Sequence, residues 1–358
     1  MIYPKDPPAA DTLEVSVFGK GVGECIVVHT GDGEWLIADS LLNPTSGQPA
    51  ALEYLAALGL PASNVVKLVV VTHWHQDHTA GLSQIFHATA KAQVVFSSAF
   101  RTSEFRELLG YDAILPPETS SLAEMRNIVG ILRERGSHFP TPLWAVANRL
   151  LRTTPNGDIY SLSPSDASIM VTLEGFRSLI PVAGDPKRRF VAQGPNDTCV
   201  VLSIRRGSHT IVLGADLESG SDPTRGWKAI ATSTTCPHPL ASAFKVAHHG
   251  SKNADEPSAW TRLIGADVAA ILTPFRALRK PLPTPTDVER LLGRTKNLYC
   301  AGSRAGIKAP SRPSNVHKLI AGKLHVIDSR LGQVRVRFPA SGEPSIEKFG
   351  AAEHLRAA

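Results

Sequence analysis

The chain has 358 residues, of which 42% are hydrophobic and 20% are charged, and this composition excludes a disordered or fibrous protein. No apolar stretch reaches the ~20 residues of a membrane-spanning helix, and the first residues do not form a charged-then-apolar leader. We therefore expect a cytoplasmic protein with no membrane partner. The net charge of +6 does not by itself exclude any class of substrate.

The first part of the chain predicts a strand meander followed by alternating helices and strands. The helix predicted at 48–58 carries Leu52, Leu55 and Leu58 at helical spacing. The run 67–71 is short, apolar and β-branched, which is typical of a buried strand. The other predicted elements here are strands at 13–18, 25–30, 34–39 and 93–97 and a helix at 83–88.

Four metal-capable side chains follow the buried strand within six positions: His73, His75, Asp77 and His78. His73 and His75 are two residues apart, so in an extended segment they point the same way. Asp77 and His78 follow in a predicted turn and face a neighbouring position. Because ligands collect beyond the carboxyl ends of strands, this pattern predicts two metal ions in one cleft.

The segment 100–192 departs from a minimal sheet-and-helix pattern. Ser121 and Glu124 have capping-box spacing before an apolar helical face, and a second helix is predicted at 166–180. We expect this partly helical segment to be an insertion that flanks the cleft and sets substrate selectivity.

The second half repeats the strand pattern, with polar side chains at the strand ends. The strand predicted at 211–215 leads into Asp216, and the strand at 243–247 leads into His248 and His249. Further strands are predicted at 199–205 and 268–272. We expect a single domain over 1–345 and a loose tail over 346–358.

The His-x-His-x-Asp-His string at 73–78 resembles the signature of the metallo-β-lactamase superfamily. The resemblance implies an α/β fold, a four-layer αββα sandwich with a dinuclear metal site at one edge. It also implies that Asp216 bridges both metals and that Asp39 supports the histidine loop through hydrogen bonds. The expected metal ligands are His73, His75, Asp77, His78, Asp216 and His248.

The string His248-His249-Gly-Ser251 is similar to the last ligand element of the hydrolase domain of DNA-uptake channel proteins and its stand-alone relatives. By its position at the strand end, His248 is the expected ligand and His249 the expected catalytic acid, although the two could be exchanged. Lys252 and Ser251 are the expected donors to substrate oxygens.

One histidine that many superfamily members carry is missing from this chain. The corresponding zone contains Asn196 and Asp197, so one metal shell is expected to be completed by one of these residues or by water. His138 is an alternative. Cys199 lies beside this zone, but the four cysteines are far apart and are expected to be free thiols.

The expected cofactors are two divalent ions, zinc first and manganese or iron as alternatives, because imidazole and carboxylate ligands suit these metals. A metal-bound hydroxide would attack the substrate, with Asp77, His249 and Lys252 as the catalytic residues. The sequence predicts no particular oligomeric state.

Three basic clusters favour an anionic substrate, such as nucleic acid or a nucleotide. They are 187–189, 276–280 and the loop that contains Arg304, Lys308, Arg312 and Lys318. The leading hypothesis is a phosphodiesterase or nuclease, and relatives found beside phage-defence proteins extend it to a defence nuclease. The alternatives are a hydrolase of lactones, amides or other carboxyl derivatives, and a non-catalytic binding module.

Overall fold

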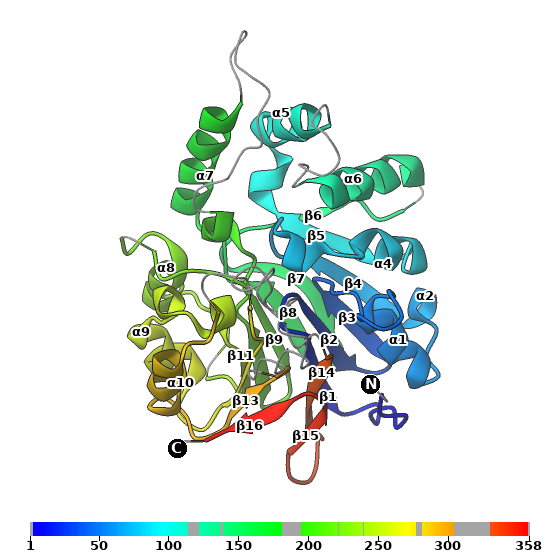
Figure 1. Cartoon of the computed structure of the whole chain (residues 1–358), viewed down its shortest axis with the longest axis vertical. Helices are drawn as coiled ribbons and strands as arrows, with labels where there is room; N and C mark the ends of the chain where they lie inside the picture. Colours follow the sequence, from blue (N-terminus) through cyan, green and yellow to red (C-terminus); the bar gives the residue numbers. More distant parts are fainter. Residues whose placement is uncertain are drawn as a thin grey trace, which may run out of the picture.

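Two eight-stranded β-sheets face each other, and helices cover their outer sides (Figure 1). The computed structural model describes residues 3–113, 122–136, 139–180, 195–220, 222–238, 240–276, 281–303 and 330–356.

The first sheet has the order β15-β14-β1-β2-β3-β4-β5-β6. Strands β3 to β6 pair in parallel, and the remaining neighbours in this sheet pair antiparallel. Its strands are β1 Leu13–Gly19, β2 Glu24–Gly31, β3 Glu34–Ala38, β4 Val66–Val71, β5 Gln93–Ser97, β6 Leu143–Ala145, β14 Gly332–Phe338 and β15 Ser345–Gly350.

The second sheet has the order β16-β13-β12-β11-β10-β9-β8-β7 and repeats this plan. Strands β10 to β13 pair in parallel, and the others pair antiparallel. Its strands are β7 Arg149–Thr154, β8 Gly157–Ser161, β9 Leu202–Arg206, β10 His209–Leu213, β11 Ala243–Lys245, β12 Ala269–Leu272, β13 Leu298–Cys300 and β16 Glu353–Leu355.

The helices fall into an N-terminal group beside the first sheet and a C-terminal group beside the second (Figure 1). The α-helices are α1 Ala50–Ala57, α2 Ala62–Val65, α3 Gln76–Thr79, α4 Leu82–Ala88, α5 Ser103–Asp112, α6 Ala123–Arg135, α7 Asp166–Leu179, α8 Gly226–Thr232, α9 Pro257–Ala259 and α10 Pro285–Leu292. Short helical turns that matter below are η4 Pro195–Thr198, η5 Ala247–Gly250 and η6 Lys252–Ala254.

Three apolar cores separate the four layers. Alternate residues of β4 face opposite sides, so Leu68 and Val70 enter the core between the sheets, and Val69 and Val71 enter the core beneath the N-terminal helices. The third core lies between the second sheet and the C-terminal helices, where Trp227 is fully buried. This arrangement confirms the predicted α/β sandwich.

The segment 100–192, which the sequence predicts to be an insertion, contributes strands to both sheets as well as helices. It supplies α5, α6 and α7, but also β6 at the edge of the first sheet and β7 and β8 at the edge of the second. Strand β7 is partly exposed and carries Arg149 and Arg152, so its sequence lacks the apolar alternation that identifies a strand. Ser121 of the predicted capping box and residues 181–194 lie outside the described residues.

The expectation of a loose tail after residue 345 is wrong for the part that the structure describes. Strand β15 pairs with β14, and β16 pairs with β13. The segment is polar and half exposed, so its sequence did not predict strands. Its attachment is electrostatic as well as apolar, because Arg335 of β14 is buried and forms ion pairs with Asp6 and Glu347.

Among the described residues, every helix is too short or too polar to cross a lipid bilayer. The four cysteines are free thiols, as expected, and only Cys236 is partly exposed.

Candidate metal centre

The loop after β4 presents two imidazoles on one side because it is extended. Trp74 lies between His73 and His75 and points the other way, where its ring packs on Phe105 and Phe176 at centroid distances of 5.5 and 5.2 Å. His73 Nε2 and His75 Nδ1 lie 3.2 Å apart on the opposite side. The buried indole thus fixes the loop, and both imidazoles face the cleft.

The next ligand candidate, His78, is oriented by Asp39. His78 Nδ1 donates to Asp39 Oδ2 at 2.7 Å, and Thr72 donates to the same carboxylate from its backbone N–H and its hydroxyl at 2.8 and 2.6 Å. Asp39 has a φ of +58°, a left-handed conformation that Asp tolerates better than most residues. This network directs Nε2 of His78 toward Asp77 and Asp216, so it is the nitrogen left to bind a cation.

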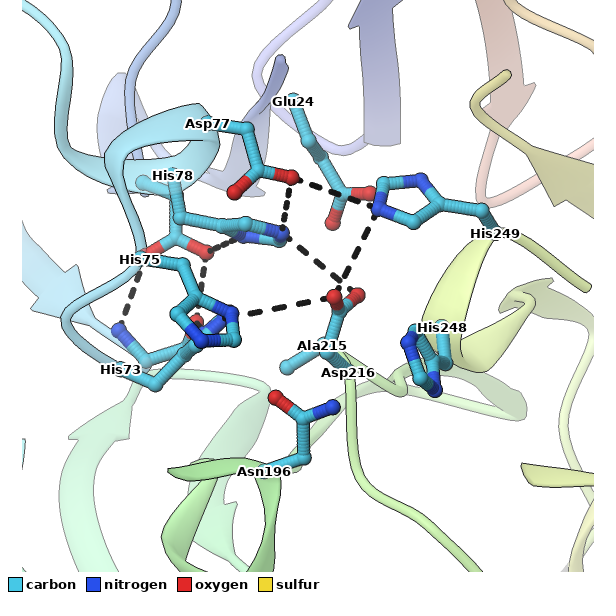
Figure 2. Close-up of polar contacts among 12 residues, drawn as sticks. Glu24, His73, His75, Asp77, His78, Asn196, Ala215, Asp216, His248 and His249 are labelled. Carbon is cyan, nitrogen blue, oxygen red and sulfur yellow. Dashed lines mark hydrogen bonds and ion pairs between the residues drawn. The ribbon is translucent and has the colours of Figure 1, made fainter. Parts of the chain in front are cut away.

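Two further candidates come from the second sheet. Asp216 follows β10, and His249 lies in η5 after β11. His249 Nε2 is 3.5 Å from Oδ2 of both Asp77 and Asp216, and His78 Nε2 is 3.5 Å from Asp216 Oδ1 (Figure 2). His73 Nε2 is 4.0 Å from Asp216 Oδ2. Ligand atoms from strand ends of both sheets therefore converge on Asp216.

Among the described residues, three groups of atoms each lie within the span that one ion could bridge. One consists of Asp39, His73 and His78, in which the Asp39 carboxylate already accepts from Thr72 and His78. The other two overlap at Asp216. One group is Asp77, His78, Asp216 and His249, and the other is His73, His75 and Asp216. His78 Nε2, Asp216 Oδ1 and His249 Nε2 are buried and have no hydrogen-bond partner among the described residues. Buried polar atoms are normally paired, so these atoms fit a site for cations.

The family model of the metallo-beta-lactamase superfamily matches residues 18–259, more than half of the chain. The chain belongs to the metallo-beta-lactamase superfamily. No curated protein matches it in sequence.

The comparison with solved structures gives matches of low identity and low TM-score. The metallo-beta-lactamase SMB-1, bound to 2-mercaptoethanesulfonate, is 14% identical, with 68% of this chain and 81% of that chain covered and a TM-score of 0.34. The metallo-beta-lactamase from Pontibacter korlensis is 13% identical, with 63% and 80% covered and a TM-score of 0.29. AidC, a dizinc quorum-quenching lactonase, is 13% identical, with 54% and 55% covered and a TM-score of 0.29.

In this superfamily member, the structure reverses the predicted order of the two adjacent histidines. His249 points into the ligand cluster, whereas His248 lies apart from it, with Nδ1 3.5 Å from Glu218 Oε1 (Figure 2). Both residues are left-handed, with φ of +47° and +53°. Because this tight turn follows β11 directly, the second imidazole rather than the first is turned into the cleft.

Ser251 and Lys252, the predicted donors to substrate oxygens, are more exposed than His249. Ser251 donates its backbone N–H to the His248 carbonyl at 2.9 Å, which closes the turn. Lys252 is exposed at the start of η6.

Asn196 is the residue of η4 that lies beside the ligand cluster (Figure 2). Its Nδ2 donates to Glu218 Oε1 at 3.0 Å, and its Oδ1 is buried without a hydrogen-bond partner in the described part of the chain. Asp197 instead forms an ion pair with Arg225 at 3.5 Å. Of the two candidates for the missing ligand, Asn196 is therefore the one that lies beside the cluster (Figure 2). The alternative, His138, lies outside the described residues.

The charges within the cluster shift its pKa values in opposite directions. Burial, together with His78 and His75, holds the pKa of His73 well below its usual value, so that ring is neutral. Burial also lowers the pKa of His249, but Asp216 and Asp77 outweigh it and raise the pKa to about 9. The same carboxylates hold the pKa of His78 well above its usual value against burial. Cations that bind here must therefore displace protons from His78 and His249.

Three residues near the site were missed by sequence reasoning. Glu24 and Lys245 are fully buried within strands, and Thr273 follows β12. The available signal was a charged side chain inside an otherwise apolar strand, as in Ala243–Lys245.

Proposed function

We propose that the protein is a metal-dependent hydrolase that cleaves phosphodiester bonds in nucleic acid or nucleotides. The observation that carries the proposal is the sharing of Asp216 by two adjacent ligand groups, because a carboxylate between two cations is the arrangement of a dinuclear hydrolase site. Two divalent ions, zinc first and manganese or iron as alternatives, would lower the pKa of a water molecule and polarise the bond to be cleaved.

The protein's own side chains hold this site in order. Asp39 and Thr72 fix His78, and the neutral His73 offers its ring nitrogen without losing a proton. We assign Asp77 and His249 to cation binding, since their atoms lie 3.5 Å apart within the cluster.

A proton donor for the leaving group is also needed. His248 lies outside the cluster, next to His249 in the chain, and its side chain is 20% exposed, with Nδ1 3.5 Å from Glu218 Oε1. It therefore suits this role better than the enclosed His249. Lys252, exposed shortly after it, is a proposed contact for substrate oxygens.

A cavity of about 450 Å³ adjoins Asp77 and offers a place for the substrate. Lys20 is the cationic residue in the lining of this cavity, and its Nζ donates to the Leu42 carbonyl at 2.7 Å. This placement supports an anionic substrate. The predicted basic residues at 187–189, 279–280 and 304–318 lie outside the described residues.

The alternative substrate is a lactone, amide or other carboxyl derivative. The walls of the same cavity include Val22, Leu41 and Ala80, which would suit an apolar acyl group.

The test is a screen of purified protein reconstituted with zinc or manganese. Plasmid, single-stranded DNA, RNA and bis-p-nitrophenyl phosphate represent phosphodiesters, and an acyl lactone and a β-lactam represent carboxyl derivatives. The proposal expects phosphodiester cleavage that is lost in Asp216→Asn and kept in Asp267→Asn, the same change at an exposed residue. Cleavage of the lactone alone would favour the alternative, and a protein that binds cations but cleaves neither would be a binding module.

A further inference from the structure

A pair of opposite charges is buried directly behind the proposed metal centre. Glu24 begins β2 of the first sheet, and Lys245 ends β11 of the second. Both side chains are fully enclosed, and Lys245 Nζ forms a close ion pair with Glu24 Oε2. Neither belongs to the ligand groups, yet each connects to one ligand.

The Glu24 side of the pair leads to His249. Thr273 Oγ1 donates to Glu24 Oε2 at 2.7 Å, which leaves the threonine oxygen free to accept. His249 Nδ1 faces that oxygen at 3.0 Å and the Thr273 carbonyl at 3.1 Å. Both partners accept from Nδ1–H, so Nε2, the nitrogen that faces Asp77 and Asp216, is the one left to bind a cation.

The Lys245 side of the pair leads to Asp216. Lys245 Nζ donates to the Ala215 carbonyl at 3.3 Å, and the backbone N–H of His248 donates to the same oxygen at 3.0 Å. Ala215 has a φ of +45°, a conformation that costs free energy in a residue other than glycine. The two donors therefore hold the strained peptide that sets the direction of the Asp216 side chain.

We propose that Glu24, Lys245 and Thr273 form a positioning unit for the ion bound by Asp77, His78, Asp216 and His249. Stability alone does not account for the pair, because apolar side chains of similar volume would stabilise the core as well or better. What an apolar pair could not do is fix the protonated nitrogen of His249 and the Ala215 carbonyl together. The inference rests on the proposed metal centre.

The test uses cobalt, whose visible absorption reports the number and geometry of ligands and so gives a readout independent of hydrolysis. Thr273→Val removes the hydroxyl with little change of shape, and Thr273→Ser restores it. Glu24→Gln removes the charge. Thr295→Val is the matched control, since Thr295 is also buried and its hydroxyl donates to a backbone carbonyl, that of Val268.

We expect Thr273→Val to weaken binding of one cobalt ion about 10- to 100-fold and to change its spectrum, with the other ion unaffected. Glu24→Gln should weaken binding of the same ion at least as much, and it can also affect the second ion because Lys245 supports the shared Asp216. Thr273→Ser and Thr295→Val should match the wild type. If Glu24→Gln fails to fold in circular dichroism, the valine and serine variants of Thr273 decide the matter.

Two results with Thr273→Val would overturn the inference: unchanged affinity and spectrum, or an equal loss of both ions. A wild-type protein that binds no cobalt would instead refute the metal centre itself. The failure of the positioning unit and the failure of the metal centre are therefore distinguishable.

Discussion

Replacing Asp39 by asparagine tests whether hydrogen bonds behind the ligands control cation binding. Asp39 Oδ1 accepts from the Thr72 backbone N–H, so an asparagine would keep its oxygen there and place its NH₂ group against His78 Nδ1. Two donors cannot face each other, and His78 must move its proton to Nε2. The nitrogen that points at Asp77 and Asp216 then loses its lone pair.

The expected loss of cation affinity follows from the hydrogen bond between His78 and Asp39. The Thr72 hydroxyl can rotate to accept from the new amide, so only the 2.7 Å bond from His78 to the carboxylate is lost. A hydrogen bond to a charged group contributes about 1.5–3 kcal/mol. At 1.4 kcal/mol per tenfold change, cation affinity should fall roughly 10- to 100-fold.

The assay is competitive titration of zinc against a chromophoric chelator, with unfolding of the chelated protein measured in parallel. Asp32→Asn is the control, because Asp32 is also left-handed, with a φ of +55°, but lies in the turn at the opposite end of β3. Asp39→Asn protein that binds both ions with wild-type affinity would refute the reasoning.

Three other variants or conditions probe the site. Asp216→Asn should weaken binding of both ions and His73→Ala mainly one, as measured by metal content after dialysis; equal losses would contradict a shared carboxylate. Without metal, the pKa of His249 rises from 6.5 to about 9, so its stabilising contribution is complete below pH 6.5 and is lost as the pH rises through 9. The melting temperature in EDTA should fall over that window while zinc affinity increases, and a flat response in both would contradict the pairing with Asp77 and Asp216. Lys20→Met should raise KM about tenfold for an anionic phosphodiester and leave KM for a neutral lactone unchanged; an equal change for both would remove Lys20 from substrate binding.

The sequence predicted the proximity of those candidate ligands that depend on short spacing or on strand ends. His73, His75, Asp77 and His78 are local in sequence, so their spacing alone predicts a cluster. Asp216 directly follows an apolar strand, and the resemblance to the superfamily then implied its place beside them. The order of His248 and His249 depends on two successive residues with positive φ. This conformation is uncommon in any residue other than glycine, so the sequence alone does not predict two such residues in a row.

The edge strands escaped prediction for a different reason. Strands β7 and β15 are partly exposed and polar, and they are held by pairing with neighbours that lie elsewhere in the sequence. Such strands carry little apolar alternation, so tertiary contacts rather than local pattern decide them.

The division of the cation-binding atoms between the two sheets links occupancy to the completion of folding. His73 to His78 come from the first half of the chain, while Asp216 and His249 come from the second, so neither half alone offers a full shell. Cations at a thousandfold excess over their dissociation constant would add about 4 kcal/mol to the stability of the assembled pair of sheets. The ions would then bind tightly only after both halves of the chain have folded, and partly folded molecules would lack hydrolytic activity.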